Sequence, residues 1–154
     1  MCGNVVVKTV DSGVPLVCCG ETMEELAPNT VDGLGEKHLP VVTRPDECTV
    51  EVRVGSIPHP MLPEHSIRFI YLETENGGQI RFLQTPFPAI ATFCGCKDRV
   101  VAVYEYCNLH GLWKTTDIPV APGSCKPDGS DESSCKMTEK ESGKSRNRKC
   151  CFRK

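Results

Sequence analysis

Residues 100–106 read VVAVYEY and are followed directly by residues 107–113, which read CNLHGLW. The first stretch is almost wholly apolar and predicts a strand that ends where Cys107 begins. Cys107 and His110 are three residues apart at this strand end, and a thiolate and an imidazole at that spacing can bind one metal ion. The stretch therefore predicts one strand of a sheet and, at its end, part of a metal site.

The chain contains four histidines, and none of them lies in the apolar phase of a predicted strand, where a packed core histidine is expected. Each lies at a strand end or in a loop-like segment rich in proline, glycine or charge. One cysteine and four imidazoles suggest a mononuclear metal site with nitrogen and sulfur ligands. The candidate ligands are His38, His59, His65, Cys107 and His110.

The body of the chain has a period of two residues. Residues 49–54 (TVEVRV) alternate polar and apolar side chains, as a half-buried strand does. Residues 75–78 (ENGG) are a turn signal between two strand-like segments and predict a hairpin. No stretch has a convincing helical period, so we expect an all-β fold, an antiparallel β-sandwich. The predicted strands are 49–54, 66–73, 79–83, 89–93 and 99–106.

Two of the segments that carry histidines contain proline and are predicted to be loops. Residues 57–65 (IPHPMLPEH) hold three prolines, which fix φ and remove amide donors. A stiff loop loses little entropy when its histidines bind a metal, and the same prolines also precede the strand that begins near Ser66. Pro40 biases the residue before it to extended backbone, so His38 is expected on a loop rather than in a helix.

Three spaced motifs resemble, in order, the metal-site motifs of superoxide reductases, a family that includes the desulfoferrodoxins and neelaredoxins. They are GEKHLP at residues 35–40, HPM with a following EH at 59–65, and CNLHGLW at 107–113. The resemblance covers about residues 34 to 116. It implies an immunoglobulin-like β-sandwich, which agrees with the periodicity, and a mononuclear non-haem iron centre.

The resemblance also implies roles for single residues. In the family, four histidines lie in a plane around iron, and the cysteine lies on the axis opposite an open position. By their place in the Glu-Lys-His motif, Lys37 is expected to attract superoxide and orient water for proton delivery, and Glu36 to be the sixth ligand of the oxidised metal. Backbone amides of residues 108–110 are expected to donate to the Cys107 sulfur. Trp113 is expected to be a core anchor.

The activity that the resemblance implies is superoxide reduction. Superoxide takes one electron and two protons and becomes hydrogen peroxide, and rubredoxin or a similar small donor supplies the electron. A thiolate ligand donates electron density to the metal and so favours this transfer.

Two alternatives from other classes stay open. A cupredoxin-like copper protein is also a β-sandwich, but it needs a His₂Cys set with a weak axial ligand, often methionine, and no methionine follows His110 until Met137. A zinc-stabilised β-sandwich without turnover is the second, because metal affinities favour zinc over ferrous iron at such ligands. The choice of iron therefore depends on the resemblance. Light absorption distinguishes the three metals.

Residues 1–33 carry a second set of cysteines, Cys2, Cys18 and Cys19. The segment resembles the desulforedoxin-type domain that precedes the catalytic domain in desulfoferrodoxins and binds one iron through a Cys-x-x-Cys pair and a later Cys-Cys pair. Three thiolates match that motif here, whereas structural tetrahedral sites normally have four. The favoured interpretation is free thiols on a vestigial hairpin. A second iron, with another cysteine completing the site, and a zinc ion are the alternatives.

Composition limits the cellular context. A chain of 154 residues with a net charge of −2 is one ordinary domain or a small domain with appendages, with no chain-wide preference for nucleic acid. No apolar run approaches the roughly 20 residues that cross a bilayer, and no secretory signal pattern is present. Eleven cysteines, an odd number, then favour reduced thiols and a cytoplasmic location. No nucleic-acid or membrane partner is expected, and the oligomeric state, including a homo-oligomer, stays open.

Residues 120–154 differ from the rest of the chain. They hold nine Lys/Arg and five Asp/Glu, a net charge of +4, whereas residues 1–119 carry −6. Few large apolar residues occur there, so the segment is expected to be disordered. Three parts are predicted: an incomplete desulforedoxin-like segment over 1–33, the catalytic β-sandwich over 34–119, and a cysteine-containing basic tail over 120–154.

Overall fold

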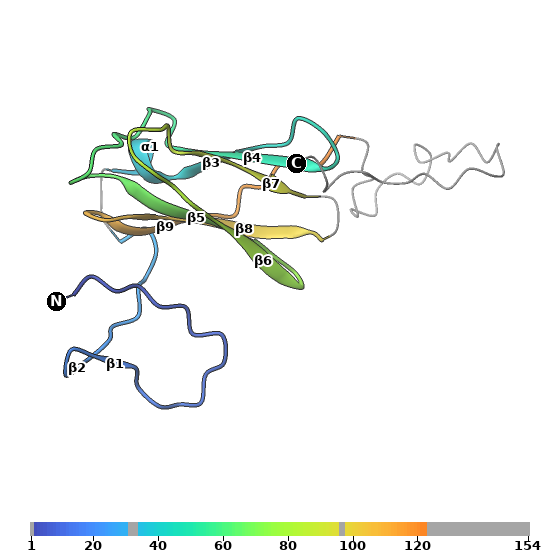
Figure 1. Cartoon of the computed structure of the whole chain (residues 1–154). Helices are drawn as coiled ribbons and strands as arrows, with labels where there is room; N and C mark the ends of the chain where they lie inside the picture. The colour runs from blue at the N-terminus through green and yellow to red at the C-terminus, as the bar shows by residue number, and fades with distance from the viewer. Residues whose placement is uncertain (1, 31–33, 96–97, 123–154) are drawn as a thin grey trace.

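The computed structural model of the chain describes residues 2–30, 34–95 and 98–122 (Figure 1). These residues form nine short strands and one helix of four residues. In chain order the elements are β1 (Val17–Cys18), β2 (Glu21–Thr22), α1 (Gly35–His38), β3 (Pro40–Thr43), β4 (Thr49–Val54), β5 (Ile67–Thr74), β6 (Gly77–Phe82), β7 (Ile90–Cys94), β8 (Val100–Cys107) and β9 (Gly111–Thr115).

Seven of the strands form two antiparallel sheets that lie over one another in Figure 1. The first sheet has the order β3-β4-β7 and the second the order β6-β5-β8-β9. This is the connectivity of an immunoglobulin-like sandwich in which strands A, B and E face strands C′, C, F and G. The predicted all-β sandwich is confirmed, and each of the five predicted strands overlaps one of β4 to β8.

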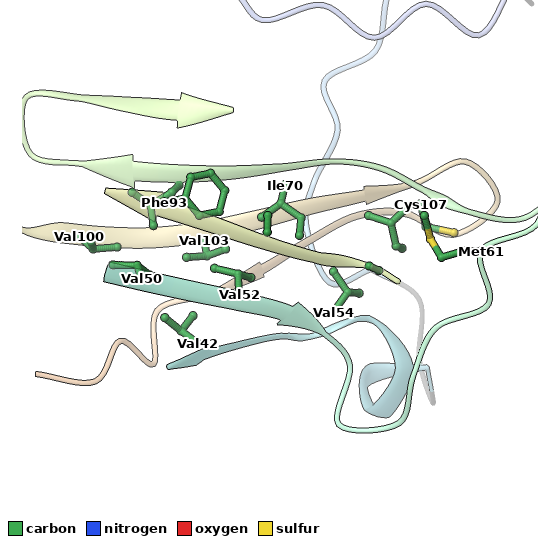
Figure 2. Close-up of a cluster of buried hydrophobic side chains, with 14 residues drawn as sticks. Val42, Val50, Val52, Val54, Met61, Ile70, Phe93, Val100, Val103 and Cys107 are labelled. Carbon is green, nitrogen blue, oxygen red and sulfur yellow. The ribbon is translucent and has the colours of Figure 1, made fainter. Parts of the chain in front are cut away.

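The core lies between the two sheets because alternate residues of facing strands point inward (Figure 2). In β4 the residues at every second position are fully buried, and in β5 the buried residues are Ile67, Ile70 and Leu72, whose alternation is interrupted by a register shift after Ile67. Burial of these β-branched and aliphatic side chains stabilises the sandwich by about 1.5–3 kcal/mol each. The fully buried members are Val50, Val52, Val54, Ile67, Ile70, Leu72 and Val103.

One end of the sandwich is built from the start of β5 and the end of β8. Ile67 pairs with Cys107, and the β5–β8 register shifts between Ile67 and Phe69. Such bulges bend a strand and re-aim its side chains, and they are common beside functional sites. We refer to this end, where β4 ends and β9 begins, as the ligand end.

The sequence patterns missed three elements of the sandwich. His38 was expected on a loop, but it is the last residue of helix α1, so that expectation was wrong; Leu39, the residue before Pro40, is extended with φ −57° and ψ 123°. The short strands β3 and β9 were also missed, because elements of four or five residues are too short for periodicity to reveal them. The predicted N-terminal hairpin is confirmed, since β1 and β2 pair as antiparallel strands on either side of Cys19 and Gly20.

The N-terminal segment is tied to the sandwich through Asn29. Its backbone amide donates to the carbonyl of Leu112, and its side-chain amide donates to the carbonyl of Lys114 (both 3.0 Å). The amide of Lys114 donates in return to Asn29 Oδ1 at 2.8 Å. Asn29 thus satisfies backbone groups along β9, the edge strand of the larger sheet, and Asn tolerates the positive φ of 60° found there.

Cys48 and Cys94 are both disulfide-bonded, so the expectation that the cysteines are reduced was wrong for these two. Cys48 directly precedes β4 and Cys94 ends β7, and these strands are antiparallel neighbours, with Thr49 opposite Cys94. Both cysteines therefore lie at the end of the sandwich away from the ligand end. A cysteine count carries no information on which thiols the fold places beside one another.

No helix in the three described stretches has the length and apolar content needed to cross a membrane. A disordered basic tail was predicted for residues 120–154. Residues 123–154, which include Cys125, Cys135, Cys150 and Cys151, lie outside the described part of the chain.

Candidate metal centre

The five candidate ligands converge at the ligand end. Their donor atoms all lie within 4.8 Å of one another. They come from four separate segments: the end of α1, the loop between β4 and β5, the end of β8, and the turn that leads into β9. The group consists of His38, His59, His65, Cys107 and His110.

The four imidazoles form a closed square. Ring centroids of neighbouring members are 4.6 to 4.9 Å apart in the order His38, His59, His65, His110 and back to His38. Neighbouring rings are steeply inclined, with interplanar angles of 71° to 82°. Rings arranged in this way direct one nitrogen each toward a common centre.

The hydrogen bonds of two rings fix which nitrogen points inward. His38 Nδ1 donates to the carbonyl of Leu34 at 2.9 Å, and His59 Nδ1 donates to the carbonyl of Pro60 at 2.6 Å. A neutral ring that carries its hydrogen on Nδ1 has a lone pair on Nε2. The two Nε2 atoms are nevertheless 3.1 Å apart. Two lone pairs at this distance repel one another unless a cation lies between them.

Within the described residues, the nitrogens of the other two rings lack an ordinary hydrogen-bond partner outside the group of five. His110 Nδ1 lies 3.0 Å from His38 Nε2, and His65 Nε2 is buried without a hydrogen-bond partner. An unpartnered buried nitrogen is unfavourable unless a ligand or ion satisfies it. The residues therefore fit a metal ion at the centre of the square.

The spacing of the nitrogens indicates the geometry of that ion. Two ligands about 2.1 Å from a metal are about 3.0 Å apart at a right angle and about 3.4 Å apart at a tetrahedral angle. The observed separations of 3.0 and 3.1 Å match the right angle. A square of four imidazoles thus does not fit a tetrahedral zinc site, and it contains more imidazoles than the His₂Cys set of blue copper proteins.

Cys107 lies on one side of the square. Its sulfur is 3.6 Å from His59 Nε2 and 3.5 Å from His110 Nδ1, and its side chain is fully buried. Burial raises the pKa of the thiol, and the backbone amides of Leu109 and His110 oppose that shift. The prediction of these two amide donors is confirmed. The prediction for the third was wrong, because the amide of Asn108 donates to the carbonyl of Ser66.

Burial keeps the imidazoles in the form that binds metals. It lowers the pKa of His38 and His65, and it lowers the pKa of His59 to about 4. Neighbouring imidazoles add to these shifts, because each charged ring would repel the next. Neutral rings have a free lone pair at neutral pH, which a metal ion requires.

Gly55 allows the two segments that carry His38 and His59 to approach one another. A Cβ atom at this position would lie 2.5 Å from the carbonyl oxygen of Ile57 and 2.7 Å from that of Lys37, and Gly55 has a φ of +77°. The contact is closed by hydrogen bonds from Ser56 Oγ and from the amide of Ile57 to the carbonyl of Glu36, both 3.1 Å. Sequence reasoning missed Gly55, because a single glycine after a strand does not reveal what its backbone contacts.

Two further residues beside the ligands are fully or almost fully buried. Trp113 is stacked on His38, with centroids 4.9 Å apart and an interplanar angle of 16°, in line with its expected role as an anchor. Glu105 was missed, although it occupies the inward phase of β8 two residues before Cys107. It has no exposed surface and no hydrogen-bond partner, and burial raises its pKa to about 9. A neutral carboxyl group therefore lies beneath the site at pH 7.

Lys37 and Glu36 lie next to the site but outside the group of five donors. The charge of Lys37 contributes to the lowered pKa of His38 and of His65, so it acts on the square. Glu36 lines an open groove with Ser56 and Val41. Residues two apart in a helical turn do not face the same way, in agreement with the absence of Glu36 from the group of donors that includes His38.

The structure also brings Cys2, Cys18 and Cys19 together. Their sulfurs are 3.3 Å apart between Cys2 and Cys18, and 3.8 Å apart between Cys18 and Cys19. The cluster is exposed or half-exposed, in contrast to the buried square. No fourth histidine, cysteine or carboxylate donor of residues 2–30, 34–95 and 98–122 joins it. The described residues thus do not fit a closed four-thiolate iron centre.

A β-sandwich that directs four imidazoles and one thiolate at a single point belongs to the class of mononuclear metal proteins. Within that class, the sequence profile described as desulfoferrodoxin matches residues 30–116. The desulfoferrodoxin of Nitratidesulfovibrio vulgaris is 43% identical over 113 residues, which cover 73% of this chain and 88% of that protein. The superoxide reductase of Pyrococcus horikoshii is 38% identical over 54% of this chain and 87% of that protein.

A solved structure agrees with the sequence comparison. The superoxide reductase of Treponema pallidum matches with a TM-score of 0.62 and 37% identity, over 71% of this chain and 90% of that one. The chain belongs to the desulfoferrodoxin family.

Proposed function

We propose that the chain is a superoxide reductase that carries one catalytic iron. The observation that supports this most strongly is the square of four imidazoles with one buried sulfur on one side. The net reaction takes superoxide, one electron and two protons to hydrogen peroxide. The chemistry that iron supplies at this site is one-electron transfer between its ferrous and ferric states. A small one-electron carrier such as rubredoxin is the proposed donor.

The candidate ligands determine the charge of the iron site and the side from which superoxide can approach it. Four neutral imidazoles and one thiolate leave a ferrous centre with a charge of +1, which attracts an anion. Cys107 belongs to the hydrophobic core cluster, whereas His65 and His110 are partly exposed. The face of the square away from Cys107 is therefore the proposed side of approach for superoxide.

Lys37 is the proposed attractor of superoxide. It carries a positive charge beside the square, in a part of the chain, residues 1–119, that has a net charge of −6. An ammonium group can also orient water for proton delivery. Lys37→Ala should slow association with superoxide several-fold at low salt and leave the iron absorption unchanged. Lys8→Ala, in the N-terminal segment, is the charge-matched control, and an equal loss in both variants would contradict this role.

Glu36 is the proposed sixth ligand of the oxidised metal. It is adjacent to Lys37 in α1, two residues before the ligand His38. Glu36→Ala should therefore change the absorption of the oxidised protein and leave the reduced protein unaffected. An unchanged oxidised spectrum would remove Glu36 from the ligand set.

The wider organisation is proposed on the same basis. Residues 34–119 form the catalytic sandwich, residues 1–33 an accessory segment, and residues 120–154 a tail of undetermined role; a homo-oligomer is compatible with this division. A cytoplasmic location stays a prediction. The disulfide bonds of Cys48 and Cys94 weigh against it, because such bonds are rare in reducing compartments. The mass of alkylated, unreduced protein from its native source tests this point.

The decisive experiment combines metal analysis with product yield. Iron-loaded protein and a reductant are exposed to a pulse of superoxide, and the peroxide formed is measured per superoxide consumed. Reduction gives one peroxide per superoxide without dioxygen, whereas dismutation gives half as much peroxide and releases dioxygen. Copper or zinc at the site, or a yield equal to dismutation, would contradict the proposal.

A further inference from the structure

The sulfurs of the three N-terminal cysteines lie close together in space. The Cys2 and Cys18 sulfurs are 3.3 Å apart, although 16 residues separate them in the chain. Each also has a donor beside it: the backbone amide of Asn4 hydrogen-bonds to the Cys2 sulfur, and Asn4 Nδ2 donates to the Cys18 sulfur at 3.5 Å. Amide donors stabilise the thiolate form, which is the nucleophilic form of cysteine.

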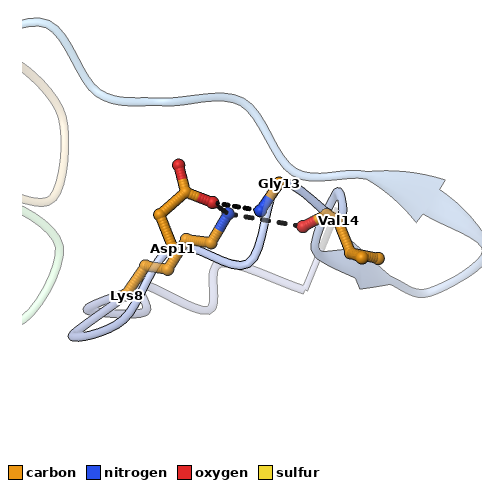
Figure 3. Close-up of polar contacts among 4 residues, drawn as sticks. All are labelled: Lys8, Asp11, Gly13 and Val14. Atoms are coloured by element: carbon orange, nitrogen blue, oxygen red, sulfur yellow. Dashed lines mark hydrogen bonds and ion pairs between the residues drawn. The ribbon is translucent and has the colours of Figure 1, made fainter.

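The chain between these cysteines is held in a defined turn (Figure 3). Lys8 forms an ion pair with Asp11 and also donates to the carbonyl of Val14 at 3.3 Å. Asp11 Oδ1 accepts the amide of Gly13 at 2.8 Å. These contacts close the loop that returns the chain to β1, so the approach of Cys2 to Cys18 is part of the folded segment.

We propose that Cys2 and Cys18 form a peroxide-sensitive dithiol, which hydrogen peroxide from the iron site oxidises to a disulfide. This rests on the proposed function, which supplies the oxidant. The chemical class of the substrate is a small hydroperoxide, and the modification is the reversible disulfide between these two residues.

The chemistry balances in two steps. The Cys2 thiolate attacks one oxygen of hydrogen peroxide, the O–O bond breaks, and Cys2 becomes a sulfenic acid while the departing hydroxide takes a proton and leaves as water. The Cys18 sulfur then attacks the Cys2 sulfur, the S–O bond breaks, and a second water leaves. Two thiols have lost two electrons, and one peroxide has become two waters.

Geometry selects Cys2 with Cys18 over the neighbouring pair. Cys18 and Cys19 are adjacent, and adjacent Cα atoms are about 3.8 Å apart across a trans peptide, below the range of about 4.4–6.8 Å that disulfides prefer. Cys2 is therefore the unstrained partner. Their sulfurs must approach from 3.3 Å to about 2.05 Å, a small shift for an exposed segment with few tertiary contacts.

Other described cysteines are poorly placed to compete. Cys107 is fully buried, and burial raises its pKa, so its thiol has little access to peroxide. Cys48 and Cys94 are already in disulfide bonds. Reactivity toward peroxide follows exposure and thiolate character, and among the described cysteines Cys2 has both, because it is exposed and the backbone amide of Asn4 lowers its pKa.

The test uses the full-length, iron-loaded protein after reduction by a dithiol and removal of excess reductant. One equivalent of hydrogen peroxide is added directly, free thiols are alkylated, and the protein is digested without reduction. Trypsin cleavage after Lys8 and Lys37 places Cys2 on one peptide and Cys18 with Cys19 on another. Mass spectrometry should find the two peptides joined and two hydrogens lighter, and the link should disappear on reduction.

Variants separate the roles of the three residues. Cys2→Ser and Cys18→Ser should lower the linked peptide to background, whereas Cys19→Ser, the matched control, should retain it. A link that persists in Cys18→Ser, or thiols that stay alkylatable in the wild type after peroxide treatment, would overturn the proposal. A metal ion bound stoichiometrically to the three sulfurs and protecting them would also overturn it.

A second arm replaces added peroxide with a superoxide pulse and an electron donor. With superoxide kept below the thiol concentration, the linked peptide should form in wild type at about twice the yield found in Cys107→Ser, where spontaneous dismutation alone supplies peroxide. If the link forms with added peroxide but the two superoxide yields are equal, the proposed function fails and the dithiol stands. If it forms in neither arm while the iron site yields peroxide, the dithiol fails and the proposed function stands.

Discussion

The Cys107 thiol and the Cys18 thiol are the same chemical group in opposite surroundings. Cys107 ends a long strand, is fully buried, and lies within 4.8 Å of four imidazole donors. Cys18 ends a two-residue strand, is half-exposed, and has two other thiols as the metal-binding groups that the described residues place beside it. Elements of the sandwich core hold the first cluster, whereas a turn and an asparagine hold the second.

This difference teaches what preorganisation requires. In the buried cluster, backbone carbonyls fix the tautomers of His38 and His59, and Gly55 allows their two segments to meet. These two rings are directed by contacts outside the site, so they lose little entropy when a metal binds. In the exposed cluster a local turn and Asn4 hold three sulfurs with no fourth metal-binding group among the described residues, which suits bond formation between sulfurs better than selective metal binding.

The largest expected effect comes from exchanging sulfur for oxygen in each cluster. Cys107→Ser should abolish superoxide reduction and the iron–thiolate absorption, because the one thiolate that the described part of the chain places at the square is lost. Cys18→Ser should leave both unchanged. Iron content, absorption and the rate of superoxide loss check this. Equal losses in the two variants would remove the distinction between the clusters.

Acid should break the buried cluster first. The pKa of His59 is lowered to about 4, whereas an unfolded histidine titrates near 6.5. Between these two values the unfolded chain binds a proton at His59, whereas the folded chain does not. The contribution of His59 to the free energy of unfolding is about 3 kcal/mol. It is fully present above pH 6.5 and is lost as the pH falls toward 4.

Iron retained per chain, measured from pH 7 to pH 3, checks this expectation. Iron should stay bound at pH 6.5 and be released as the pH approaches 4, together with the loss of folded structure. The alkylation rate of Cys2 and Cys18 does not depend on the protonation of an imidazole, so its pH dependence should differ from that of iron release. Iron that stays bound at pH 3 would contradict the account.

Glu105 lies beside the buried cluster only, and its burial should make the stability of the sandwich depend on pH. Its pKa is about 9 in the fold, against about 4.3 in an unfolded chain, so between these values the folded state keeps a proton that the unfolded state has released. Stability therefore falls as pH rises through this range. Glu105→Gln removes the dependence and should stabilise the protein by about 3 kcal/mol at pH 7, with no gain near pH 4.

Urea unfolding of wild type and variant at pH 4.5, 7 and 8.5 measures this difference. Glu51→Gln is the control, because Glu51 is exposed on the neighbouring sheet and should show no such pH dependence. A Glu105→Gln variant that loses stability at pH 7 would show that the carboxylate has a favourable partner.

The smallest expected effect tests the connection between the two regions. Asn29→Ala removes two side-chain hydrogen bonds to Lys114 and places alanine at a φ of 60°. The change should destabilise the protein by about 2 kcal/mol and speed proteolysis of the N-terminal segment, with no effect on superoxide reduction. Asn29→Gly keeps the backbone conformation and should lose less. A fall in activity would mean that the connector also positions the iron site.

The sequence predicted the sandwich and all five donors, because both follow from local patterns. Alternation marks the strands, and His110 lies three residues after Cys107 at a strand end. The environment of the site was not predictable, because it depends on contacts between segments far apart in sequence. Gly55 against Lys37 and the disulfide-bonded Cys48 and Cys94 are such cases. Glu105 could have been found, since its inward phase between Val103 and Cys107 is visible in the alternation.

The central claim is that four imidazoles and one thiolate bind the same iron ion. X-ray absorption at the iron edge of the iron-loaded protein tests it most directly, since nitrogen and sulfur neighbours scatter differently. The account predicts one iron per chain with four nitrogen neighbours from imidazole and one sulfur neighbour, and loss of the sulfur contribution alone in Cys107→Ser. An iron with no sulfur neighbour in the wild type, or with several sulfur neighbours and no imidazole, would contradict it.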